Sequence, residues 1–112
     1  MAFKIRFRMD TLRVLGFAAI GAGYTAIGAS FANPVRIIKL TNLTDKAVII
    51  SFNGATDQSI LPAQSFTLYD LTTNKVRDDG FFIDVGTVVY AKQGPSGAPA
   101  SGSVYLETVY AG

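Results

Sequence analysis

Hydrophobic and polar positions alternate with a period of two along most of this chain. The clearest stretch runs from Val35 to Leu71 and holds three apolar runs with turn-forming residues between them. These runs are Val35 to Leu40, Ala47 to Phe52 and Phe66 to Leu71. Because successive side chains of a strand point to opposite faces of a sheet, each run predicts a β-strand.

Residues that favour turns lie next to all three runs. A polar cluster from Thr41 to Asp45 follows the first run, and its short side chains hydrogen-bond readily to their own backbone. Asn53 and Gly54 follow the second run and predict a tight hairpin turn, since both residues tolerate positive φ. Pro62 precedes the third run, and it lacks the N–H that an internal sheet position requires.

The pattern continues toward the N-terminus in a stretch that has a second interpretation. We expect strands at Val14 to Ile20 and Tyr24 to Ile27, joined by a Gly-Ala-Gly turn and followed by a loop from Gly28 to Pro34. Residues 14–32 carry no charge and follow basic residues, which also resembles a secretory signal or a transmembrane helix of minimum length. Four glycines interrupt this run, so two strands are the preferred interpretation.

The C-terminal half alternates in the same way. We expect strands at Phe81 to Val85, Thr87 to Lys92 and Ser103 to Tyr110. A polar surface loop from Thr72 to Gly80 precedes them, and a flexible or polyproline-like connection spans Gln93 to Gly102. No segment shows sustained helical periodicity with caps, so helix should be short or absent.

About seven to nine strands at this spacing predict an all-β fold, a β-sandwich of jelly-roll type. The chain of 112 residues is long enough for one core, and we assign a single domain to residues 14–112 and an extended basic N-terminal arm to residues 1–13. The expected core residues are Ile37, Ile49, Phe52, Leu61, Phe66, Leu68, Phe82, Val88, Tyr90, Val104 and Leu106.

The composition of the chain excludes several classes of function. Hydrophobic residues make up 49% of the chain and charged residues only 16%, which is apolar for a soluble domain and indicates that some apolar surface faces a partner. The chain has no cysteine and no histidine, which excludes disulfides, thiolate zinc sites and most familiar catalytic constellations. We therefore expect no enzymatic activity, no metal site and no cofactor.

The N-terminal arm carries much of the positive charge. It holds four basic residues against one acidic residue, whereas the rest of the chain has six basic and seven acidic residues. Its residues 3–8 alternate strictly, which predicts a strand that adds to a sheet edge in its own domain or in a neighbour. Its charge suits an acidic protein surface or nucleic acid, and a solvated strand face is an equally good interpretation of the charge alone. We expect contacts with protein rather than nucleic acid or membrane, through Phe3, Lys4, Ile5, Arg6, Phe7, Arg8 and Arg13.

Several residues suggest chemistry at first sight. Asp78, Asp79 and Asp84 resemble a calcium loop, but they lack its ordered ligand spacing, so an acidic turn is preferred. Glu107 is the only glutamate and lies on a terminal strand, with nothing in the sequence to bring Asp57 or Asp70 beside it as a glycosidase pair.

Two further patterns have simple explanations. Residues 42–44 match the glycosylation sequon, and we interpret them as a turn. The aromatic residues suggest a stacking platform for sugars or bases, although core and interface packing is the commoner use of such residues. They are Tyr69, Phe81, Phe82, Tyr90, Tyr105 and Tyr110.

Six turn-and-strand segments follow one another along the chain: Pro34 to Ile37, Thr41 to Asp45, Ser51 to Gly54, Leu61 to Ala63, Tyr69 to Lys75 and Ser101 to Tyr105. Their order resembles that of small virion structural proteins of tailed bacteriophages. The resemblance covers about residues 20–112 and leaves the first dozen residues unmatched. Such proteins include jelly-roll cement or decoration proteins of the capsid and small neck or tail components.

The resemblance implies a non-enzymatic protein of the virion, assembled in the host cytoplasm, with the major capsid protein or other virion proteins as partners. We expect a cement or decoration protein that forms a homo-oligomer or symmetric assembly and clamps neighbouring capsid subunits with its N-terminal arm. One alternative is a neck, collar or tail component, either a ring or a receptor- or carbohydrate-binding β-module. Another is a secreted or membrane-anchored bacterial β-domain.

Overall fold

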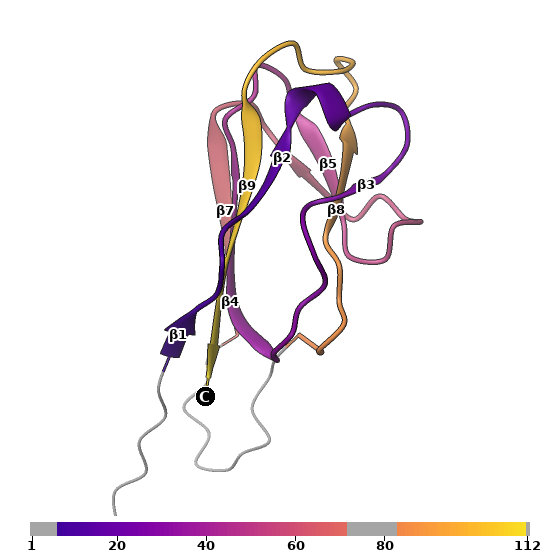
Figure 1. Cartoon of the computed structure of the whole chain (residues 1–112). Coiled ribbons are helices and arrows are strands. Elements are labelled where there is room, and N and C mark those ends of the chain that lie inside the picture. The colour runs from indigo at the N-terminus through magenta and orange to yellow at the C-terminus, as the bar shows by residue number, and fades with distance from the viewer. Residues whose placement is uncertain (1–6, 72–82, 112) are drawn as a thin grey trace, which may run out of the picture.

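The computed structural model describes residues 7–71 and 83–111 (Figure 1). Within these residues the chain is all-β, with nine strands in two antiparallel sheets and a single 3-10 turn at Phe17–Ala19. The two sheets face each other across a shared apolar core. The predicted all-β sandwich is therefore confirmed.

Sheet A contains five strands and includes both ends of the described chain. Its central strands are β9 (Ser103–Ala111) and β4 (Val35–Asn42). β7 (Ser65–Asp70) pairs with the other side of β4 and forms one edge. At the opposite side β1 (Phe7–Met9) and β2 (Arg13–Gly16) both pair with β9, one after the other along that strand.

Sheet B contains four shorter strands. Their order is β3 (Thr25–Ala26), β8 (Tyr90–Gln93), β5 (Val48–Ser51) and β6 (Ser59–Leu61). Backbone hydrogen bonds extend the β3–β8 contact beyond the strands, because the Ile27 N–H donates to the Val89 carbonyl at 2.7 Å. This extension carries the chain down to the start of β4.

Strand pairing is nested along the chain. β5 pairs with β6, β4 with β7, β3 with β8 and β2 with β9, so each pair encloses the previous one in sequence. The nested pairs are distributed over both sheets. In addition, β4 pairs with β9 in sheet A and β5 pairs with β8 in sheet B.

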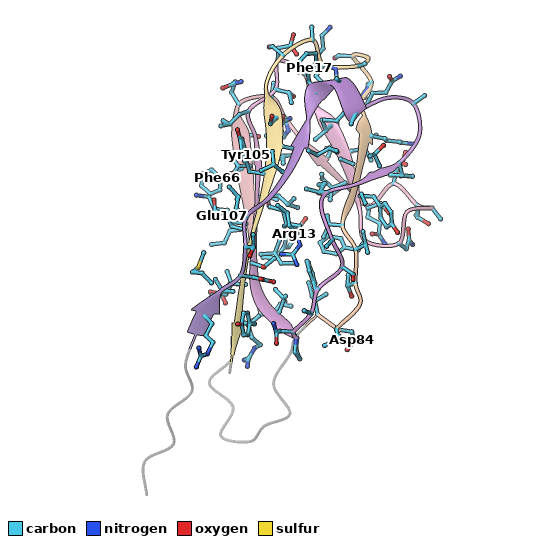
Figure 2. The ribbon with its side chains drawn as sticks, viewed as in Figure 1. Arg13, Phe17, Phe66, Asp84, Tyr105 and Glu107 are labelled. Carbon is cyan, nitrogen blue, oxygen red and sulfur yellow. The ribbon has the colours of Figure 1, made fainter. Side chains whose placement is uncertain are left out.

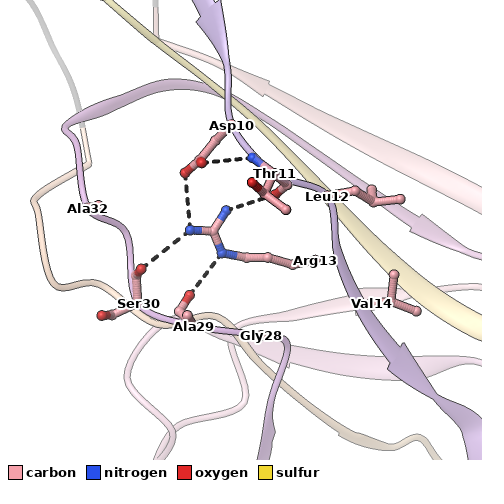
Figure 3. Close-up of a pocket in the computed structure, with 9 residues that line it drawn as sticks. All are labelled: Asp10, Thr11, Leu12, Arg13, Val14, Gly28, Ala29, Ser30 and Ala32. Atoms are coloured by element: carbon pink, nitrogen blue, oxygen red, sulfur yellow. Dashed lines mark hydrogen bonds and ion pairs between the residues drawn. The ribbon is translucent and has the colours of Figure 1, made fainter.

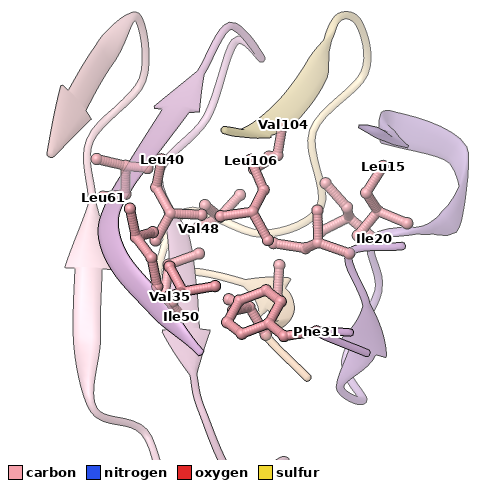
Figure 4. Packing of buried hydrophobic residues seen from close by; sticks show 14 residues of the cluster. Leu15, Ile20, Phe31, Val35, Leu40, Val48, Ile50, Leu61, Val104 and Leu106 are labelled. Carbon is pink, nitrogen blue, oxygen red and sulfur yellow. The ribbon is translucent and has the colours of Figure 1, made fainter. Parts of the chain in front are cut away.

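The core fills the space between the two sheets (Figure 4). Strand alternation explains its composition, because inward positions such as Leu40 and Leu106 lie opposite each other in register and are fully buried. The cluster comprises Leu15, Ile20, Ile27, Phe31, Val35, Ile38, Leu40, Val48, Ile50, Leu61, Val89, Ala91, Val104 and Leu106.

A buried polar network links the end of β4 to β6. Asn42 is fully buried, and its amide donates to the carbonyl oxygens of Lys46, Leu61 and Pro62 at 2.9 to 3.2 Å. Its side-chain oxygen accepts hydrogen bonds from the backbone N–H and the hydroxyl of Thr44. The residues that match the glycosylation sequon therefore form a turn, and every polar atom of the Asn42 side chain has a partner in its own chain.

Several predicted strands differ from the observed ones. The strand expected at 14–20 stops at Gly16 and continues as the 3-10 turn. Asn53 and Gly54 form the start of a longer loop between β5 and β6, and β6 itself was not predicted. Of the strand expected at 81–85, the described part contributes an isolated bridge between Ile83 and Val35. The loop predicted at 72–80 lies outside the described residues.

The connection from Gln93 to Gly102, predicted to be flexible, is tied to the turn after β4. The Gly94 N–H donates to the Ala47 carbonyl at 3.1 Å, and the Ala100 N–H donates to the Asp45 carboxylate at 2.8 Å. This hydrogen bond from Ala100 holds the pKa of Asp45 below its usual value.

The predicted core is partly wrong. Leu61, Val104 and Leu106 are buried as expected, but Phe66 and Leu68 are 61% and 54% exposed. Apolar or aromatic residues occupy both faces of β7, and a shift of one residue exchanges the two faces of a strand. Of the other residues, Ile37, Ile49, Phe52, Val88 and Tyr90 are only partly buried, and Phe82 lies outside the described residues.

The uncharged run from residue 14 to 32 forms β2, the 3-10 turn, β3 and the segment that leads into β4. Among the described residues, no helix has the length and apolar character needed to cross a membrane.

Candidate interaction surface

The outer face of sheet A, which points away from sheet B, carries exposed apolar side chains from several strands. Phe66 and Leu68 come from β7, Val14 from β2 and Met9, which is 65% exposed, from β1. Figure 2 shows Phe66 on this side of the sheet together with Tyr105 and Glu107 of β9. Exposed apolar clusters of this kind are typical of surfaces that bind another molecule.

The register arranges these side chains in three rows across the sheet. Side chains opposite each other on neighbouring strands lie about 5 Å apart, so each row forms a continuous surface. The first row is Val14, Tyr105, Thr41 and Phe66, the second is Glu107, Lys39 and Leu68, and the third is Met9, Val109, Ile37 and Asp70.

The middle row places two opposite charges side by side in this apolar surface. Lys39 and Glu107 are register partners on β4 and β9, yet they form no ion pair with each other within 4 Å. The Lys39 ammonium lies 4.9 Å from the centre of the Phe66 ring instead, toward β7. A cation over an aromatic face is attracted by the electrons of the ring, which explains this orientation.

The outer face ends at an open strand edge. Within the described chain, β7 pairs with β4 alone, so its other edge carries backbone groups that no neighbouring strand uses. Such edges accept an additional strand from another molecule unless something covers them. The sequence signal for this surface is the presence of large apolar residues on both faces of β7, which the prediction of a buried Phe66 and Leu68 overlooked.

The residues predicted to bind a partner lie in three different situations. Phe3, Lys4, Ile5 and Arg6 lie outside the described residues. Phe7 and Arg8 belong to β1, which pairs with β9 of its own chain, Phe7 in register with Ala111 and Arg8 with Tyr110. Arg13 begins β2 and is only 9% exposed.

Arg13 is a structural residue, which differs from its expected role as a surface contact of the arm. Its guanidinium lies between the two sheets over the ring of Phe31, at 5.0 Å from the ring centre (Figure 2). All five of its N–H groups have acceptors in the same chain. These acceptors are the carbonyl oxygens of Thr11, Ala29 and Ser30, the hydroxyl of Thr108 and the carboxylate of Asp10, at 2.9 to 3.4 Å.

A surface pocket of about 420 Å³ lies between residues 10–14 and 28–32, with Arg13 at its centre (Figure 3). Gly28 has a φ of +72°, and a Cβ at this position would lie 2.7 Å from Cγ of Arg13. The glycine therefore makes room for the arginine side chain. Because the guanidinium donors already have acceptors, Arg13 offers no free N–H group to an anionic ligand in this pocket.

A second polar cluster lies on sheet B. The Asp57 carboxylate is 2.8 Å from the Lys92 ammonium and accepts a hydrogen bond from the Tyr24 hydroxyl. The hydrogen bonds from Lys92 and Tyr24 lower the pKa of Asp57, and the hydrogen bond to Asp57 raises the pKa of Lys92. Water reaches all three side chains, so the Asp57–Lys92 contact is a surface ion pair. It ties the β5–β6 loop to β8.

The other chemical candidates from the sequence do not assemble into a site within the described chain. No group of three or more acidic residues there is placed to hold a metal ion. Asp84 is exposed, and Asp78 and Asp79 lie outside the described residues. Tyr69 faces sheet B, where it packs edge-on against Phe52 with ring centres 6.0 Å apart, whereas Tyr105 lies on the outer face. These two tyrosines therefore cannot form one stacking platform.

No protein-family model, no curated protein and no solved structure matches this chain.

Proposed function

We propose that this chain is a non-enzymatic structural protein of a tailed-phage virion, which binds and stabilises the capsid as a cement or decoration protein. The observation that carries the proposal is the exposed apolar outer face of sheet A, with Phe66, Leu68 and Met9 more than half exposed. An exposed apolar surface of this kind is suited to an interface with another protein.

The strand order supports the same proposal. The orders β2-β9-β4-β7 and β3-β8-β5-β6, with their nested pairing, support a jelly roll of eight strands. Jelly rolls occur in viral capsid proteins and also in lectins and enzymes, so the fold alone does not determine the function. The sequence favours the structural role, since it contains neither histidine nor cysteine for the commonest catalytic arrangements.

The N-terminal arm has a clamping role in this proposal. Alternating Phe3, Ile5 and Phe7 against Lys4, Arg6 and Arg8 suits a strand that adds to a sheet edge of a capsid subunit and meets acidic groups there. Arg13 is not part of this contact, because its side chain is engaged within its own domain.

The test is to measure how many copies of this chain purified virions contain relative to the major capsid protein. Hundreds of copies per particle support a cement protein of the capsid surface. About a dozen copies would assign the chain to the neck or tail instead, and absence from particles overturns the proposal.

The clamp is tested separately by deleting residues 2–6, which precede β1. The truncated chain should fold with the same circular dichroism spectrum and bind undecorated capsids more weakly than the full chain. Unchanged binding and unchanged particle stability would rule out the arm as the clamp.

A further inference from the structure

We propose that the outer face of sheet A is a self-association surface, on which two copies of this chain pack face to face about a twofold axis. The axis runs parallel to the strands, between β4 and β9. It places Lys39 of each copy against Glu107 of the other. This proposal goes beyond the role in a virion and applies to the isolated protein.

The charge pattern at the centre of the face selects the partner. Lys39 and Glu107 lie side by side on the outer face, and neither forms an ion pair within the described residues. A single pair of adjacent opposite charges is self-complementary, since a second copy turned by 180° presents an acid to the base and a base to the acid. Twofold interfaces pair residues reciprocally in this manner.

The same pattern selects the direction of the axis. A twofold axis that lies between the two faces but runs perpendicular to the strands would set Lys39 against Lys39 and Glu107 against Glu107. Like charges brought together at an interface oppose association strongly. An axis along the strands produces two reciprocal ion pairs and is the favoured geometry.

The apolar rows are complementary under that axis. Each row faces its own copy in reversed order, so Val14 meets Phe66 of the second copy and Ile37 meets Val109. The exception is the corner of the third row, where Asp70 faces Met9 at the margin of the surface. Charged groups at the rim of an interface remain accessible to water and change its affinity little.

The size of the surface sets the expected affinity. Four strands about 4.8 Å apart and three rows about 6.8 Å apart cover about 400 Å² per copy. The total of about 800 Å² is below the roughly 1,200 Å² of a standard specific interface, so the dimer should be weak and reversible. Association is therefore to be measured from about 10 μM to about 1 mM by sedimentation equilibrium.

Charge reversal gives the decisive test. K39E carries two acidic side chains at the centre of the face and E107K carries two basic ones there, so each variant alone should dissociate at least about tenfold more readily than the wild type. An equimolar mixture of K39E and E107K should regain association as a heterodimer, because every contact is then between opposite charges. If a variant failed to associate only because its own fold had changed, mixing it with the other variant would not restore association.

Apolar variants provide an independent check with a matched control. Leu68 on the outer face of sheet A and Ile60 on sheet B are both 54% exposed. Leu68→Ser should weaken association about tenfold or more, whereas Ile60→Ser should leave it unchanged. Circular dichroism and thermal unfolding establish that each variant is folded.

Three results would overturn the proposal. These are a wild-type chain that stays monomeric at all concentrations, a mixture of the two reversed variants that stays monomeric, or an equal effect of Leu68→Ser and Ile60→Ser. A monomeric wild type would leave the outer face to a different protein partner. The copy number in virions is a separate measurement, so this proposal and the proposed function fail independently.

Discussion

The guanidinium of Arg13 lies 5.0 Å from the centre of the Phe31 ring, and both side chains are buried between the sheets. Arg13 belongs to β2 of sheet A, whereas Phe31 belongs to the segment that follows β3 and hydrogen-bonds to Thr87. The contact therefore joins the two sheets at the end of the sandwich where strand pairing is sparse.

Removing the Arg13 guanidinium should destabilise the domain strongly. Arg13→Met keeps an apolar stem but leaves the Asp10 carboxylate and several carbonyl oxygens without their donor, which should cost about 3 kcal/mol of unfolding free energy. Arg8→Met, the same change at an exposed position of β1, should alter stability by less than about 0.5 kcal/mol. Urea denaturation measures both, and equal effects would contradict the structural role of Arg13.

Gly102 should not tolerate a side chain. It has a φ of +86°, and a Cβ there would lie 2.1 Å from the carbonyl oxygen of Leu43. Gly102→Ala should therefore cost about 3 kcal/mol or more, since backbone must move to relieve the overlap. Gly97 has a φ of +95° with open space around it, so Gly97→Ala should cost only the conformational penalty of about 1–2 kcal/mol. Similar thermal midpoints for the two variants would disagree with this geometry.

The amide of Asn42 should be essential to the β4 to β6 connection. Asn42→Ala removes the amide donor from the buried Leu61 carbonyl oxygen and the acceptor from the buried Thr44 N–H, which should lower stability by about 3 kcal/mol. The comparison is Asn53→Ala, where the lost acceptor serves the hydroxyl of Ser51 and two N–H groups that water reaches, and about 1 kcal/mol is expected. Chemical denaturation of the two variants in parallel tests the difference.

Acid should weaken the fold through Asp45 and Asp57. The pKa of each is lowered in the folded chain, Asp45 first by the N–H of Ala100 and Asp57 first by Lys92. Their contribution is therefore complete above the unfolded value of 3.8 and is lost as the pH falls through the lower folded values. The double variant Asp45→Asn, Asp57→Asn should lose less thermal stability than the wild type between about pH 5 and about pH 2. Parallel pH profiles would count against this assignment.

The sequence predicts the long strands of sheet A well and their surroundings less well. β9 alternates clearly over many residues, and its inward positions Val104 and Leu106 follow directly from the period of two. On β4 the expected core residue Ile37 lies on the outer face, because the register shifts between Val35 and Ile37, and Ile38 and Leu40 are buried instead. β3 and β6 are two and three residues long, so they carry too few positions for a period to show. Their pairing depends on neighbours that are distant in sequence.

The candidate interaction surface was missed for a physical reason. β7 carries Phe66 and Leu68 on one face and Tyr69 on the other, so alternation alone does not state which face is buried. Arg13 was assigned to the surface because arginine is rarely buried without partners, and its partners come from residues 29, 30 and 108, which a linear pattern cannot place beside it.

Nested pairing also bears on the order in which this chain folds. β5 and β6 are neighbours in sequence and can pair early, whereas β2 and β1 must wait until β9, which is distant in sequence, has been synthesised. Pairings between residues so distant in sequence carry a large loop-closure entropy and fold on the millisecond to second scale. During translation the apolar inner side chains of β2 and β4 therefore wait for strands still on the ribosome, which makes the nascent chain sensitive to aggregation and to chaperone supply.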